Sequence, residues 1–165
     1  MGAPLNRVEA AGLHTIDVTQ LLPLPPIRPL DLAQFLEEGL ILREKVFRAA
    51  LAQHDWQTYQ DALVPIFVST EAIVPPWGFL LVGMYLAPYA RYYGVGPPEA
   101  LIERYQLLQL QELPLEPFRD QKILLKGCAN LSPAVLTEFF RRVMPVARLV
   151  FYGEACSSVP IYKRK

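Results

Sequence analysis

The stretch DQKILLKGCANLSPAVLTEFFRRVMPVARLVFYGEAC (residues 120–156) predicts the fold class of the chain. Two apolar runs, 120–126 and 148–152, have the length and composition of buried strands. Between them, Ser132 is a typical N-cap residue and begins a helix that runs through Val143. A strand, a helix and a second strand in this order predict a parallel pair of strands joined by a right-handed crossover.

The same alternation extends upstream to about residue 62. Further strands are predicted at 63–68 and 91–95, and helices at 77–89 and 97–111. We therefore expect an α/β fold with a mainly parallel sheet of about four to five strands and flanking helices, in a Rossmann-like three-layer arrangement.

The N-terminal third is less regular. The run 13–18 alternates like a short strand, and the proline-rich run 22–29 must be extended because proline biases the residue before it away from helix. Two helical pieces follow. We expect a single domain over 1–165, in which 1–61 is an irregular N-terminal strand and helical arm packed on an α/β core over 62–165.

Composition excludes several classes of protein. Of the 165 residues, 52% are hydrophobic and only 19% are charged, which predicts a compact globule. Sixteen basic and sixteen acidic residues give zero net charge, so we expect no nucleic-acid partner. The longest apolar stretch, 72–90, is interrupted by three prolines, and the N-terminus has no signal-peptide pattern. We expect a cytoplasmic protein without a membrane partner, in which thiols stay reduced.

The chain contains two cysteines, Cys128 and Cys156, and each follows the end of a predicted strand. Parallel strands would place both thiols at the same edge of the sheet, where α/β proteins usually build their sites. The pair could bind iron, zinc or an iron-sulfur cluster, carry a persulfide, or supply a catalytic thiol. The alternative is that one or both are buried core residues, as free cysteines most often are.

Three other side chains are candidate metal ligands or general bases. His54 stands beside Asp55, which could orient its imidazole, although a histidine at a helix end more often contacts the last carbonyls. Glu71 follows the strand predicted at 63–68, and Glu154 follows the strand predicted at 148–152. Most carboxylates in loops are simply solvated. If all strands shared one sheet, the loops after four of them would form one edge.

No known catalytic motif supports a specific reaction. The chain has no glycine-rich phosphate loop, no Walker pattern and no G-x-S-x-G elbow. Nucleotide binding and serine hydrolase chemistry are therefore not expected, and whether the chain is an enzyme stays open.

Several blocks of sequence resemble one bacterial family, catalogued as domain of unknown function 2480. The resemblance runs from about Asn6 to Lys163 and is strongest in Glu38–Lys45, His54–Trp56, Ala72–Pro75 with Trp77, Glu116–Asp120, Lys126–Cys128 and Gly153–Pro160. It implies no established activity. It implies a genomic neighbourhood of SUF-type iron-sulfur assembly proteins, which would then be candidate partners.

Three functions remain open. The first is an accessory binding protein of iron-sulfur or sulfur metabolism, in which Cys128 and Cys156 hold a metal, a cluster or a persulfide. Because two thiolates cannot complete a tetrahedral site, further ligands from His54, Glu71 or Glu154, or from a homo-oligomer, would be needed. The second is a small cysteine-dependent enzyme. The third is a protein-interaction module whose cysteines are structural.

Overall fold

The computed structural model describes residues 12–126, 130–154 and 156–165. The chain forms two compact units. We call the one built from the chain through Pro23 and from Gln106–Lys165 the terminal unit, and the one formed by Leu24–Tyr105 the central unit. The expected boundary, between an arm over 1–61 and a core over 62–165, does not coincide with the boundaries of these units. That the chain is a single domain stays a prediction.

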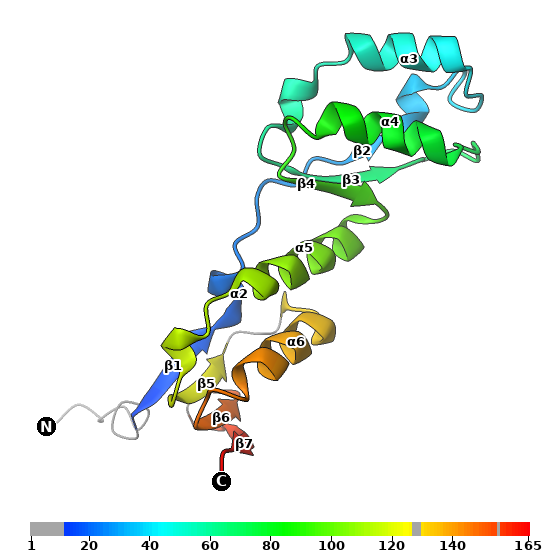
Figure 1. The fold of residues 1–165 in the computed structure, drawn as a ribbon. Coiled ribbons are helices and arrows are strands. Elements are labelled where there is room, and N and C mark those ends of the chain that lie inside the picture. The colour runs from blue at the N-terminus through cyan, green and yellow to red at the C-terminus, as the bar shows by residue number, and fades with distance from the viewer. Residues whose placement is uncertain (1–11, 127–129, 155) are drawn as a thin grey trace, which may run out of the picture. The chain divides into compact units, whose positions relative to one another are not determined.

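The terminal unit contains a mainly parallel four-stranded sheet in the order β1-β5-β6-β7. β1 pairs parallel with β5, and β5 pairs parallel with β6, whereas β7 runs antiparallel to β6. Figure 1 shows these strands beside α6. The elements of this unit are β1 (Leu13–Asp17), α2 (Val18–Leu21), the 3₁₀ turn η3 (Glu116–Phe118), β5 (Lys122–Lys126), α6 (Pro133–Val143), β6 (Leu149–Tyr152) and β7 (Val159–Lys163).

The helix α6 forms for local reasons that the sequence shows. The Ser132 hydroxyl accepts a hydrogen bond from the Val135 amide at 3.2 Å, which satisfies one free amide at the helix N-terminus. Val135, Phe139 and Val143 recur at helical spacing, are at most 1% exposed, and share one core with residues of β5 and β6. The predicted strand-helix-strand unit is therefore confirmed.

The central unit contains a three-stranded parallel sheet in the order β2-β3-β4. Figure 1 shows α4 lying along this sheet, and α3 packs into the same core through Phe47 and Leu51. The elements are β2 (Leu30–Asp31), the 3₁₀ turn η1 (Leu32–Phe35), α3 (Glu44–Gln53), the 3₁₀ turn η2 (Trp56–Tyr59), β3 (Leu63–Phe67), α4 (Pro76–Leu86) and β4 (Tyr92–Val95). α5 (Pro98–Glu112) follows β4. In the described part of the chain, no helix is long and apolar enough to cross a membrane.

The α/β class and the mainly parallel pairing are confirmed, but the strands divide between two sheets. β3 and β4 belong to the central sheet, and β5 and β6 to the terminal sheet. The expectation that four loops share one edge is therefore wrong. The reason is that apolar patterns identify strands but not their partners: β1 pairs with β5, more than 100 residues away, and β2 pairs with β3.

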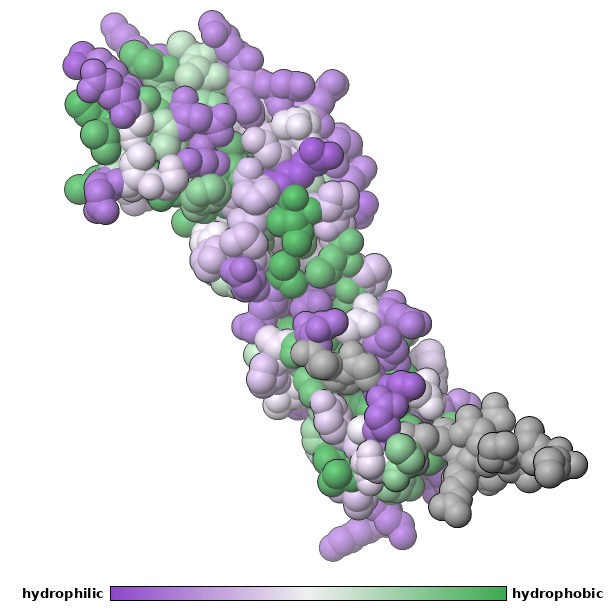
Figure 2. All heavy atoms as spheres, turned by 180° about the vertical axis from the view of Figure 1, so that it is seen from behind, coloured by the Kyte–Doolittle hydropathy of each residue, from purple (hydrophilic) through white to green (hydrophobic). Residues whose placement is uncertain are grey.

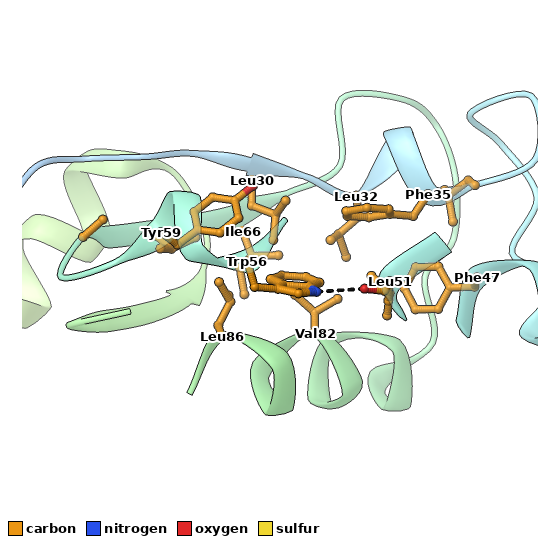
Figure 3. Packing of buried hydrophobic residues seen from close by; sticks show 13 residues of the cluster. Leu30, Leu32, Phe35, Phe47, Leu51, Trp56, Tyr59, Ile66, Val82 and Leu86 are labelled. Carbon is orange, nitrogen blue, oxygen red and sulfur yellow. Dashed lines mark hydrogen bonds between the residues drawn. The ribbon is translucent and has the colours of Figure 1, made fainter. Parts of the chain in front are cut away.

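The core of the central unit is organised around Trp56, which is 6% exposed. Figure 3 shows its indole between the sheet and the Val82 and Leu86 side chains of α4. The indole Nε1 donates a hydrogen bond to the Leu51 carbonyl at 2.8 Å, which holds the end of α3 against this core. The indole ring stacks on the Tyr85 ring at a centroid distance of 5.2 Å.

Replacing Trp56 with phenylalanine should lower the free energy of unfolding by about 1–3 kcal/mol, because the Leu51 carbonyl keeps only the longer hydrogen bond from the His54 amide and the smaller ring leaves space in the core. Urea denaturation followed by circular dichroism measures this change. Trp77→Phe is the matched control, since Trp77 is 37% exposed and should cost less. Equal losses in the two variants would show that the buried hydrogen bond is not the cause.

Candidate functional site

The edge where β5 and β6 end is the first candidate site, because both cysteines follow these strands in sequence. β5 and β6 are direct neighbours, and Leu125 pairs with Tyr152 at their carboxyl ends. The Gly153 amide donates a hydrogen bond to the Leu125 carbonyl at 3.0 Å, so the chain leaves β6 while still attached to β5. The order of these strands, which the sequence leaves open, makes the two loops start side by side.

Two charged side chains meet at this edge. The Lys126 ammonium lies 3.3 Å from a carboxylate oxygen of Glu154, with both side chains about half exposed. An exposed pair of this kind contributes roughly 0–1 kcal/mol to stability. Its main effect is on position, since it joins the end of β5 to the loop after β6. The candidate ligand Glu154 is thus engaged by a cation.

Of the two cysteines, Cys156 lies within the described residues and Cys128 does not. Cys156 is an exposed free thiol in the loop after β6. Cys128, the other candidate metal ligand or nucleophile, lies outside the described residues. Within residues 12–126, 130–154 and 156–165, no group of three or more His, Cys, Asp or Glu side chains is arranged to hold a metal ion.

Glu71 and His54 belong to the central unit, whereas Glu154 and Cys156 belong to the terminal unit. Glu71 is exposed in the loop after β3. Its neighbours Ser69 and Thr70 have structural hydrogen bonds: the Ser69 hydroxyl donates to the Asp31 carboxylate at 2.5 Å, and the Thr70 hydroxyl donates to the Gly39 carbonyl at 2.6 Å.

The contact between Asp31 and Ser69 is the polar feature that sequence reasoning missed. Asp31 is the N-cap of the 3₁₀ turn η1, and its carboxylate accepts a hydrogen bond from the Ala33 amide at 3.0 Å. The same carboxylate also accepts from the amide of Ser69, at 3.0 Å. Burial raises the pKa of Asp31, but the hydrogen bonds from Ser69 and Ala33 outweigh burial and lower it. The two residues lie 38 positions apart, so no local pattern links them.

His54 forms the C-cap of α3, and its amide donates to the Leu51 carbonyl at 3.3 Å. Its ring packs edge-on against Phe35 and Trp56, with centroid distances of 5.0 and 4.8 Å, and its Nε2 lies 3.2 Å from the Tyr59 hydroxyl. The neighbouring Asp55 carboxylate accepts from the Gln57 amide at 3.1 Å as the N-cap of η2. These contacts are those of a packing residue at a helix end.

Apolar side chains at the surface are the remaining feature of interest. On the face shown in Figure 2, hydrophobic residues reach the surface in several separate places among hydrophilic ones. Among the large apolar side chains on the described helices, Leu80 and Met84 of α4 have the largest exposed fractions, 74% and 57%. The sequence predicted α4 but not which of its apolar faces would lack a partner, because nearly every residue of the helix is apolar.

His54 should make the stability of the fold depend on pH. Burial lowers the pKa of its imidazole below the usual 6.5, and the charge of Asp55 only partly opposes this. The unfolded chain therefore binds the proton more readily, and the free energy of unfolding should fall as the pH drops through about 6.5. Urea titrations between about pH 8 and about pH 5 measure the fall.

Two variants assign this pH dependence. His54→Gln should flatten it, and Asp55→Asn should steepen it, because removing the carboxylate lowers the pKa of His54 further. A wild-type slope in His54→Gln would show that the titration belongs to other groups.

Comparison with known proteins gives one positive result. A family model described as "Protein of unknown function (DUF2480)" matches residues 3–164. The comparison with curated proteins found no match, and the comparison with solved structures found none. The family match covers almost the whole chain and confirms the resemblance expected from the sequence blocks. The chain therefore belongs to the DUF2480 family.

Proposed function

We propose that the chain is an accessory binding protein of iron-sulfur or sulfur metabolism, with a two-cysteine site at the carboxyl edge of β5 and β6. The site would hold iron, zinc, an iron-sulfur cluster or a persulfide. One observation carries the proposal: β5 and β6 are neighbouring parallel strands, and the sequence that follows each of them contains one of the two cysteines.

The spacing of the strands supports a shared site. Neighbouring strands lie about 4.8 Å apart, and a metal ion holds thiolate sulfurs at about 2.3 Å. Loops that leave two adjacent strand ends can therefore direct both thiolates to one ion. The ion pair between Lys126 and Glu154, at 3.3 Å, brings side chains from the same two strand ends into contact.

Two thiolates leave two positions of a tetrahedral site to other ligands. Glu154 is the candidate that belongs to the same loop as Cys156, and it would have to exchange its contact with Lys126 for the metal. The remaining position would come from water or from a protein that receives the metal or sulfur. SUF-type iron-sulfur assembly proteins are the partners that we propose for this exchange.

The test is the metal and acid-labile sulfide content of the protein, purified without air and without an affinity tag. We expect near-stoichiometric metal in the wild type and background levels in both Cys128→Ser and Cys156→Ser, because each thiolate is a ligand of the same site. Ser157→Ala is the matched control, since it changes a side chain of the same loop without removing a thiol.

Two results would contradict the proposal. Metal-free protein whose cysteine variants behave like the wild type would remove the metal and cluster versions. The same preparation treated with inorganic polysulfide would then test the persulfide version, because a thiolate attacks a sulfur atom of the polysulfide, forms the persulfide bond and releases the shortened polysulfide. Loss of metal in only one cysteine variant would remove the shared site.

A second function, that of a protein-interaction module, is favoured by a different observation. Leu80 and Met84 expose most of their apolar surface on one face of α4. Exposed apolar patches on small proteins commonly mark surfaces that bind another protein.

A further inference from the structure

The side-chain charges of the chain sum to zero, but one end of the terminal sheet has a positive surplus. At the end where β5 and β6 begin and β7 finishes, residues 116–122, 144–149 and 163–165 come together. These stretches contain two acidic side chains and six basic ones, a surplus of four positive charges. We call the six basic residues the basic edge: Arg119, Lys122, Arg148, Lys163, Arg164 and Lys165.

Backbone hydrogen bonds hold the basic edge together. The Arg164 amide donates to the Arg148 carbonyl at 3.0 Å, and the Arg148 amide donates to the Gln121 carbonyl at 2.9 Å. The Asp120 amide donates to the Val146 carbonyl, also at 2.9 Å. The basic side chains therefore project from strand ends that are joined to one another, and their charges stay concentrated in one place.

The two carboxylates within the basic edge show which kind of group its cations bind. The Arg119 guanidinium donates to both carboxylate oxygens of Glu116, at 3.0 and 2.9 Å, and the Arg164 guanidinium donates to the Asp120 carboxylate. The hydrogen bond and the charge of Arg164 lower the pKa of Asp120, and the charges of Arg119 and Arg148 lower it further. A carboxylate at this edge is therefore stabilised by several arginines at once.

An apolar pocket adjoins the basic edge. Leu149 pairs with Lys122 on one side and with Lys163 on the other, so these three side chains form a row on one face of the sheet. Phe151, two residues further along β6, lies on the same face, opposite the face on which Val150 joins the core. The pocket, which we call the β6–β7 pocket, has a volume of about 490 Å³ and is lined by Leu149, Phe151, Pro160, Ile161, Tyr162 and Lys163.

The β6–β7 pocket is accessible from solvent. Ile161 is 50% exposed, and Lys163 is exposed as well. Apart from Lys163, the lining residues are hydrophobic or aromatic, so the pocket favours an apolar side chain. Lys163 belongs to both the pocket and the basic edge, which makes the two parts one continuous surface.

We propose that the basic edge and the β6–β7 pocket together bind an acidic segment of another protein, with one large apolar side chain in the pocket and aspartate or glutamate side chains on the cations. Charge complementarity selects this occupant, because a surplus of four positive charges attracts an acidic segment and repels a basic one. The zero net charge of the chain does not cancel this attraction, since exposed charges more than about 8 Å away are largely screened at physiological salt.

A nucleic acid fits this surface less well than an acidic protein segment. Its backbone carries a phosphate at every nucleotide and would bring some of them against Glu116 and Asp120, which already occupy two of the arginines. The phosphate backbone also has no apolar group for the β6–β7 pocket. An acidic segment can place its carboxylates between these two residues and still supply an apolar side chain.

The basic edge lies where β5 and β6 begin, whereas both cysteines follow the ends of these strands in the sequence. A segment bound at the basic edge therefore leaves the carboxyl edge of the sheet open. Binding at the basic edge needs neither thiol, so it is a second function and not a part of the two-cysteine site.

Fluorescence anisotropy of a labelled peptide mixed with the full chain tests this proposal. The probe is a fluorescein-labelled peptide that has one phenylalanine between two runs of about four glutamates each. We expect saturable binding that weakens as sodium chloride rises from about 50 mM to about 300 mM, because the added ions screen the charges. Alanine in place of the phenylalanine of the peptide should raise the Kd at least about fivefold, because the pocket loses its occupant.

Arg148→Glu and Lys163→Glu should each raise the Kd at least about tenfold, because each replaces an attraction with a repulsion. Both side chains are exposed, so the variants should keep the wild-type circular dichroism spectrum. Lys45→Glu is the matched control. Lys45 is an exposed lysine of α3 in the central unit, so this variant changes the net charge of the chain by the same amount and should keep the wild-type Kd.

Several results would overturn the proposal. A chain that does not bind the peptide up to about 1 mM has no such surface, and a Kd that Arg148→Glu and Lys163→Glu leave unchanged places the peptide elsewhere. Tighter binding of single-stranded oligothymidylate, or of vesicles that contain phosphatidylserine, would assign the basic edge to a nucleic acid or to a membrane surface instead. Because the readout is peptide binding and not metal content, failure here is distinguishable from failure of the two-cysteine site.

Discussion

The parallel pairing of β1 with β5 is the constraint on which the rest of the architecture depends. It joins residues 13–17 to residues 122–126 and leaves the whole central unit between them in the sequence. A parallel pair needs a crossover, and here the crossover contains a complete second sheet with its own core. β6 can then add to β5 through the short connection over α6, and β7 completes the sheet.

This pairing also has a kinetic cost. Bringing distant segments together loses chain entropy before the contact contributes any stability, and folding slows as the mean sequence separation of contacts rises. The central unit has all its strands within Leu24–Tyr105, so its pairings can form without β1 or β5. We expect it to fold first and to shorten the effective distance between β1 and β5.

The parts of the fold that follow from local sequence were predictable, and those that depend on distant partners were not. Ser132 and the apolar spacing of α6 predicted a helix that the structure confirms. Two helical pieces were expected in the N-terminal third, and the first of them is only the short turn η1. The chain then passes through Gly39, whose φ of 72° favours glycine. The strand β7 was not predicted, because Pro160 lies within it and proline is rare in strands other than edge strands.

The same division between local and distant information applies to the candidate site. The sequence predicts that both cysteines follow strand ends, but only the strand order shows that these ends are neighbours.

The features of β7 have a consequence for how copies of this chain can meet. An edge strand with free backbone groups is a template on which a strand of another molecule can add, and repeated addition leads to aggregation. β7 contains Pro160, which has no amide hydrogen, and ends at the charged Lys163, and its register with β6 shifts between Val150 and Phe151. Each of these features interrupts a continuous ladder. The outer edge at β7 is therefore protected against open-ended strand addition.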